Sequence, residues 1–393
     1  MVNFAPNFFY RIACLCFSLY LSLSGSTLAS LDYSDRLGDP DYTGLCEVYG
    51  DYFPIGAAVY SHELDDPRLV DFILKNFNSI TPEWELKQVS LNPHAPDAPC
   101  TSPHETCVDG WHFEGMDRLA NFARDNDLQV RGHTLIWPVS EGVWMLYTDE
   151  TKTTLVDKET LFARMEEYIK TVMQRYGDVI GVWDVVNEPF HYNWFAKLKE
   201  ETNIYKIAGE EFVVKAFEYA DKYSKDGDIL LVNETFVEGS NAKTYNLFSS
   251  VEKWLKQGVR IDGIGTQGHM GTISTVPFDA NMKVVDDLAA RCRKLGIKLE
   301  YTEVDIKLYE KQEQREEEVP EWLAVWQINK YKKFFEALRR NRDTIIGVTF
   351  WGLDDAHSVI NYDAIYNGRI PDAPMLFDMN GMPKQNFYAV CDF

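Results

Sequence analysis

Apolar runs rich in β-branched residues alternate along this chain with segments of helical periodicity. The runs lie at residues 54–59, 77–81, 129–137, 181–187, 228–233, 262–269, 298–304 and 345–351. The helical segments have apolar residues near i, i+3, i+4 and i+7, and they lie at 66–77, 113–127, 159–176, 210–223, 242–257, 281–296 and 317–341. Only residues 384–393 follow the last run as a helical candidate, so we expect a short eighth helix.

Eight strands that alternate with helices predict the α/β class and a (β/α)8 TIM barrel. A doubly wound sheet is the rival architecture, but no glycine-rich phosphate loop follows any of the apolar runs. No linker rich in Pro, Gly or Ser divides the chain. We therefore expect one catalytic domain over residues 30–393.

Polar and aromatic residues gather where the predicted strands end. In a barrel these ends meet at one rim, which carries the active site. Twelve of these residues are our candidate site: Glu83, Lys87, His133, Trp137, Asn187, Glu188, Asn233, Gln267, His269, Glu303, Asp305 and Trp351.

Glu188 and Glu303 end the fourth and seventh runs and should face one another across the barrel mouth. Glycoside hydrolysis needs such a pair, because one carboxylic acid protonates the leaving oxygen while the other attacks the anomeric carbon or activates water. Other interpretations are a turn carboxylate for Glu188 and a helix-start acid for Glu303. Asn233 lies in an Asn-Glu-Thr glycosylation sequon, but its place at a strand end favours a polar role in the site.

The N-terminus has the layout of a secretory signal. Arg11 ends a polar-basic start, residues 12–23 are apolar, and small residues precede a cleavage site expected after Ala29. Residues 1–29 are therefore predicted to be removed and the protein to be secreted to the extracellular space. An uncleaved signal anchor is the alternative, although the apolar run is shorter than the roughly 20 residues of a membrane span.

Composition narrows the choice of partner. The formal net charge is -22, which argues against nucleic acid and anionic membranes as partners. Aromatic residues make up 14% of the chain and suit a groove that stacks flat sugar rings. We expect a polysaccharide or oligosaccharide substrate and a monomeric protein without membrane contact after signal removal. No C-x-x-C pair or His-rich tract indicates a metal, and we expect no cofactor.

Five cysteines remain after removal of the signal. Cys100 and Cys107 flank a short loop and are expected to form a disulfide bond. Cys46 and Cys391 lie near the two ends of the mature chain, which meet in a closed barrel, so a second disulfide is expected there. Cys292 is predicted to be a buried thiol. The four cysteines to be paired allow three connectivities in principle.

Six short motifs give the chain a resemblance to a known family. They are FNSITPEWELK, GHTLIW, WDVVNEPF, GIGTQGHM, YTEVDI and TFWG, which occur in this order between residues 55 and 384. The chain resembles the family 10 glycoside hydrolases, the retaining endo-β-1,4-xylanases. The resemblance implies a (β/α)8 barrel, retention of configuration and no metal.

The resemblance also implies a role for each candidate residue. Glu188 matches the general acid/base and Glu303 matches the nucleophile that forms a glycosyl-enzyme ester. We expect a raised pKa for Glu188, which would keep it protonated near the working pH. Asn187 matches a residue that holds the sugar 2-hydroxyl or the surroundings of the nucleophile.

The remaining matches are to substrate contacts and supporting residues. His269 matches the histidine on the nucleophile, Asp305 holds its imidazole, and Gln267 lies in the same wall. Glu83, Lys87 and His133 match polar contacts to the sugar on the non-reducing side, and Trp137 and Trp351 match stacking walls. A surface ion pair between Glu83 and Lys87, core histidines, and a core Trp351 are the alternatives.

Three departures from the family pattern concern the substrate. Trp84 stands where the family has Asn, Pro138 begins a stretch that is usually His-Ser-Gln, and Val359 stands where a second Trp is usual. They leave open a related barrel hydrolase that acts on another β-linked glycan or glycoside. An inactive secreted sugar-binding protein is the alternative from a different functional class, but it would have no use for the two glutamates with their His269–Asp305 support.

Overall fold

Eight parallel strands close into a barrel. The computed structural model describes residues 32–92, 110–192, 197–238, 241–272 and 282–393. The barrel strands pair in chain order, and the last pairs with the first. They are β1 (Ile55–Val59), β2 (Ser79–Pro82), β3 (Gln129–Gly132), β4 (Ile180–Asn187), β5 (Ile229–Glu234), β6 (Gly263–Thr266), β8 (Lys298–Lys307) and β9 (Ile345–Phe350). A short strand, β7 (His269–Gly271), pairs with the outer half of β8 and places His269 opposite Asp305.

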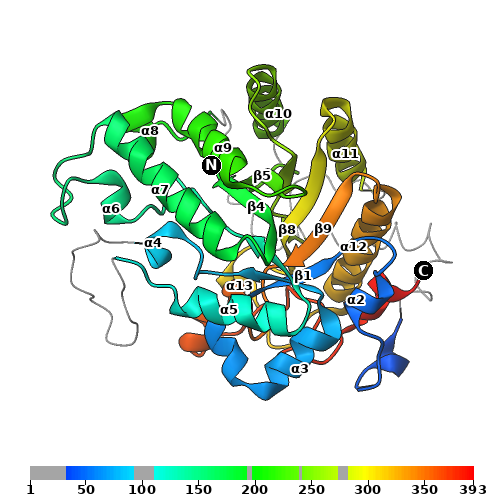
Figure 1. The fold of residues 1–393 in the computed structure, drawn as a ribbon. Helices are drawn as coiled ribbons and strands as arrows, with labels where there is room; N and C mark the ends of the chain where they lie inside the picture. The colour runs from blue at the N-terminus through cyan, green and yellow to red at the C-terminus, as the bar shows by residue number, and fades with distance from the viewer. Residues whose placement is uncertain (1–31, 93–109, 193–196, 239–240, 273–281) are drawn as a thin grey trace, which may run out of the picture.

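Amphipathic helices surround the strands (Figure 1). The major ones are α3 (Pro67–Asn76), α5 (Glu114–Asp125), α7 (Lys158–Tyr176), α9 (Glu211–Tyr223), α10 (Asn241–Lys256), α11 (Lys283–Leu295) and α12 (Glu321–Arg340). The expected short eighth helix is α14 (Gln385–Cys391). Each predicted helical segment is thus found, with ends shifted by a few residues. The barrel prediction is confirmed, and the pairing of β9 with β1 excludes the open doubly wound sheet.

A small and a large residue lie opposite one another on the neighbouring strands β3 and β4, where Gly132 pairs with Trp183. Trp183 of β4 is fully buried. It lies against Gly132 of β3, where a Cβ atom would be only 2.3 Å from the indole ring. Gly132 is therefore required by close packing, and the residue after it, His133, is held at the rim.

The two ends of the described chain meet, as the closed barrel predicts. The Tyr49 hydroxyl, after the short helix α2 (Leu45–Val48), donates to the carbonyl of Val390 in α14. However, the predicted disulfide between Cys46 and Cys391 is wrong, because both thiols are free. Cys46 Sγ instead lies 3.6 Å from the carbonyl oxygen of Lys75.

The other cysteine predictions have different outcomes. Cys292 is a buried free thiol, as predicted. Cys100 and Cys107 lie outside the described residues, as does the predicted signal segment. Within the ranges that the structure describes, none of the helices has the length and apolar character needed to cross a bilayer.

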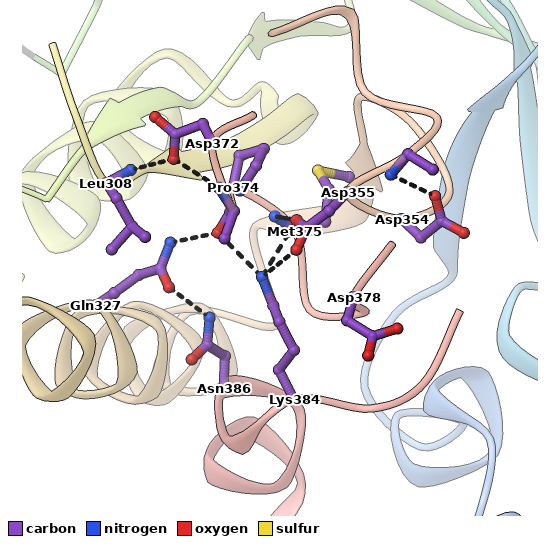
Figure 2. Close-up of polar contacts among 12 residues, drawn as sticks. Leu308, Gln327, Asp354, Asp355, Asp372, Pro374, Met375, Asp378, Lys384 and Asn386 are labelled. Atoms are coloured by element: carbon purple, nitrogen blue, oxygen red, sulfur yellow. Dashed lines mark hydrogen bonds and ion pairs between the residues drawn. The ribbon is translucent and has the colours of Figure 1, made fainter. Parts of the chain in front are cut away.

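A polar network holds the long segment between β9 and α14 against the barrel wall (Figure 2). Lys384 Nζ lies 2.8 Å from Asp355 Oδ2 and 3.0 Å from the carbonyl of Ala373. Asp372 accepts from the backbone N–H of Leu308, just beyond β8, at 2.8 Å. These contacts tie the segment that follows Trp351 to itself and to the end of β8.

Candidate active site

Glu188 directly follows β4 and lies at the rim. Its backbone has φ of 50°, a left-handed conformation that costs a non-glycine residue roughly 1–2 kcal/mol. Two backbone hydrogen bonds hold it: Asn187 N donates to Ile136 O, and Glu188 N donates to Asn233 O, both at 2.8 Å. The carboxylate is buried, with 8% of the residue exposed.

Asn233 and Gln267 hold the two glutamates from both sides. Asn233 Nδ2 donates to Glu303 Oε1 at 2.8 Å, while its carbonyl accepts the Glu188 N–H. Gln267 Nε2 donates to Glu188 Oε1 at 2.9 Å, while its carbonyl accepts the Glu303 N–H at 2.8 Å. Each amide residue therefore fixes the side chain of one glutamate and the backbone of the other.

The side chain of Asn233 is fully used. It also donates to Asn187 Oδ1 at 3.0 Å and accepts from the Thr302 hydroxyl at 2.7 Å, and the residue is completely buried. This position leaves no room for a glycan and supports the predicted polar role.

His269 links Glu303 to Asp305. Its Nε2 lies 3.2 Å from Glu303 Oε2, and its Nδ1 lies 2.5 Å from Asp305 Oδ2. Burial acts to lower the pKa of His269, but the carboxylates of Asp305 and Glu303 outweigh burial and hold it well above its ordinary value. These two carboxylates therefore favour the protonated form of the imidazole between them.

His133 approaches Glu303 from the barrel interior. Its Nδ1 lies 2.8 Å from Asp184 Oδ2 and 4.0 Å from Glu303 Oε1. Asp184 is fully buried, and its charge is paired with Arg131, whose Nη2 is 2.8 Å from Asp184 Oδ1. Arg131 in turn pairs with Glu300 at 2.9 Å. His133 is thus set by a buried ionic network.

Three indole rings surround the ammonium group of Lys87. Its Nζ lies 4.6 Å from the ring centroid of Trp84, 5.0 Å from that of Trp137 and 5.7 Å from that of Trp351. Burial lowers the pKa of Lys87. Lys87 and Glu83 are both buried, so they do not form a surface ion pair, although the charge of each acts on the other.

Glu83 lies beside two tyrosines. Burial raises the pKa of Glu83 to about 7. The Tyr362 hydroxyl is 3.5 Å from Glu83 Oε2, and the hydroxyl of Tyr60 also bonds to this carboxyl group. A carboxyl group with such a pKa is available both to donate and to accept hydrogen bonds with sugar hydroxyls at neutral pH.

Two residues that the sequence did not reveal contact Glu188. The Tyr192 hydroxyl donates to Glu188 Oε2, and Lys199 Nζ lies 3.4 Å from the same oxygen. Burial acts to raise the pKa of Glu188, but the hydrogen bonds of Gln267 and Tyr192 and the charge of Lys199 outweigh it, and the pKa lies below its ordinary value. The prediction of a raised pKa is therefore wrong for the substrate-free site.

The structure brings all twelve predicted residues to one end of the barrel interior or its rim. Of the three departures from the family pattern, Trp84 and Val359 are exposed at the surface, by 44% and 45%, and Pro138 is buried. Asp184 and Arg131 were also missed. Both are charged residues in the middle of apolar strands, and this feature of the sequence could have identified them.

Comparison with known proteins places this geometry in a family. The sequence pattern of glycosyl hydrolase family 10 matches residues 44–393. The chain belongs to glycosyl hydrolase family 10. The predicted family is thereby confirmed. Membership of this family also confirms the predicted enzyme class, a retaining endo-β-1,4-glycanase.

Two relatives of this family 10 chain align with it over most of their length. It is 34% identical to endo-1,4-beta-xylanase A of Caldicellulosiruptor saccharolyticus, covering 89% of this chain and 95% of the relative. It is 35% identical to a beta-1,4-xylanase of Dictyoglomus thermophilum, covering 89% and 90%.

Solved family 10 structures share the fold. An endo-1,4-beta-xylanase from Caldicellulosiruptor owensensis has a TM-score of 0.78 at 29% identity, covering 90% of this chain and all of the other. A mutant enzyme in complex with xylotriose has a TM-score of 0.76 at 30% identity, again covering 90% of this chain and all of the other.

Proposed function

We propose that this family 10 chain is a secreted endo-β-1,4-xylanase that cleaves xylan with retention of configuration. The observation that carries the proposal is the shared support of Glu188 and Glu303 by Asn233 and Gln267 at the barrel rim. The xylanase names of its relatives and the xylotriose bound to one structural neighbour support xylan as the substrate.

In this mechanism Glu303 attacks the anomeric carbon and Glu188 protonates the leaving oxygen. Asn233 and His269 hydrogen-bond to the Glu303 carboxylate and keep it aimed. After the leaving group departs, Glu188 takes a proton from water, and the hydroxide oxygen cleaves the ester on Glu303. Lys87, Glu83 and His133 contact the sugar on the non-reducing side, and Trp137 and Trp351 form the walls around it.

A second candidate is a related hydrolase for another β-linked glycan. Trp84 favours it, because an exposed indole stands where the family has an amide that bonds to sugar hydroxyls. A site built for such hydrogen bonds discriminates strongly between sugars. The inactive sugar-binding alternative is disfavoured, because stacking and binding alone do not require a positively charged imidazole between two carboxylates.

A hydrolysis panel tests the proposal. Wild type, Glu188→Ala and Glu303→Ala are incubated with xylan, mixed-linkage glucan, cellulose and mannan, and released reducing sugar is measured. We expect wild type to cleave xylan best and both variants to be strongly impaired. Cleavage of another glycan but not xylan would favour the second candidate, and binding without cleavage would favour the inactive protein. Sequencing the exported protein, with Ser30 expected first, tests secretion.

A further inference from the structure

Lys199 is a buried cation on the acid/base residue. Only 3% of Lys199 is exposed, and its Nζ lies 3.4 Å from Glu188 Oε2 and 4.2 Å from the ring centroid of Tyr192. Its backbone is anchored on both sides, since Lys199 N donates to Pro189 O at 2.8 Å and the Thr202 hydroxyl donates to Lys199 O at 2.7 Å. The ammonium group therefore has a fixed place.

The ion pair between Lys199 and Glu188 matters because both groups are buried. A buried ammonium group is costly unless it has an anionic partner. The other carboxylate nearby, Glu234, is 2.7 Å from Lys243 and acts on Lys199 more weakly than Glu188 does. Within the described residues, the ion pair of Lys199 is therefore with Glu188.

Other charged and polar groups face Glu188 from the surrounding elements, but they do not replace Lys199. They are Tyr192 from its own loop, Gln267 after β6, Glu234 of β5 with Lys243 of α10, Glu303 of β8 and Lys87 beyond β2. Gln267 is neutral, and the charge of Lys87 acts on Glu83 and Glu303 as well as on Glu188.

We propose that Lys199 is a positioning residue for the acid/base reaction, which holds the Glu188 carboxylate by its charge and sets the pH range in which Glu188 carries the catalytic proton. The inference rests on the proposed function, because it assumes that Glu188 is the acid/base. It adds that Lys199, a loop residue outside the barrel strands, controls the pH range in which the enzyme is active.

Lys199 acts on Glu188 when Glu188 gives up its proton. In the first step the Glu188 O–H bond breaks and its proton goes to the leaving oxygen, as the glycosidic bond breaks and Glu303 bonds to the anomeric carbon. Lys199 stabilises the Glu188 carboxylate that this step forms. It also keeps the pKa of Glu188 low, so the fraction of enzyme with a protonated Glu188 falls at lower pH than it would without Lys199.

The test is the pH dependence of kcat/KM for Lys199→Met, Lys199→Arg and the control Lys197→Met. Lys197 lies on the same loop and is exposed, so its removal changes the charge of the protein without affecting the pair. The substrates are two aryl β-xylobiosides, one with a poor and one with a good leaving group. Only the poor leaving group requires a proton from Glu188.

We expect the alkaline limb for the poor leaving group to move to higher pH by about one pH unit or more in Lys199→Met. The limb should stay near its wild-type position in Lys199→Arg and Lys197→Met. A structural role alone would lower kcat/KM equally at all pH values, so an unmoved limb in a folded Lys199→Met protein would overturn the inference.

A direct titration keeps the inference separate from the proposed function. The carboxyl carbon of Glu188 is titrated by NMR in wild type and in Lys199→Met, without any substrate. A higher midpoint in the variant supports the role of Lys199 even if the glycan proves to be different, whereas equal midpoints contradict it. Absence of xylan cleavage by wild type would refute the proposed function alone.

Discussion

Asn233 and Gln267 hold the two glutamates in a crossed arrangement. The side-chain amide of Asn233 bonds to Glu303 and that of Gln267 bonds to Glu188, while each backbone carbonyl accepts from the opposite glutamate. Truncation of one side chain therefore disturbs one carboxylate and leaves the backbone support of both intact. The two residues offer a way to separate the roles of the glutamates without removing either.

We predict different leaving-group dependence for Asn233→Ala and Gln267→Ala. Loss of a hydrogen bond to a charged group costs about 1.5–3 kcal/mol, or roughly ten- to a hundredfold in rate. Asn233→Ala should lose this factor with good and poor leaving groups alike, because it disturbs the nucleophile. Gln267→Ala should lose it mainly with poor ones. Steady-state kinetics on a series of aryl xylobiosides measures both, and identical profiles would contradict the assignment.

Lys87 should contribute to sugar binding through its ammonium group. Its Nζ lies among three indole rings in a buried position, where a bond to a sugar hydroxyl is little weakened by water. We expect Lys87→Met to lower kcat/KM on xylo-oligosaccharides by roughly tenfold or more. The control is Lys256→Met on the exposed face of α10, which should change kcat/KM little. Equal values for the two variants would refute this role.

Trp84 should determine which glycan is preferred. Replacement by Asn restores the family residue at an exposed rim position. If the indole merely displaces a hydrogen bond to xylan, Trp84→Asn should raise kcat/KM on xylan by roughly five- to tenfold, which corresponds to one neutral hydrogen bond of about 1 kcal/mol. A loss on xylan would show instead that the ring stacks on the substrate.

Gly132 should be required for stability. A methyl group at this position would meet the ring of Trp183 on the neighbouring strand β4. We expect Gly132→Ala to lower the free energy of unfolding by about 1–3 kcal/mol, as overpacking does. Gly181→Ala in the neighbouring strand is the matched control, since nothing lies within 4 Å of its added Cβ. Urea denaturation compares the two, and equal stability would contradict the packing argument.

The barrel and the two glutamates could be predicted because both depend on local sequence. Glu188 directly follows β4 and Glu303 lies in the outer half of β8, and parallel strands bring these ends to one rim. Lys199 could not be predicted, because it lies in an irregular loop eleven residues beyond Glu188 and only tertiary contacts reveal its partner. The lowered pKa of Glu188 was missed for the same reason. The pairing of Cys46 with Cys391 failed because proximity of chain ends does not fix the direction of a thiol.

In the proposed mechanism Glu303 forms the covalent intermediate and Glu188 serves as acid/base. A 2-fluoro-xylobioside with a good leaving group should trap the first covalent species, because the fluorine slows its hydrolysis. Mass spectrometry of the peptides then locates the added sugar. We expect one sugar on the peptide that contains Glu303 and none on the peptide that contains Glu188. A label on Glu188, or an unlabelled enzyme that still hydrolyses xylan with inversion of configuration, would contradict it.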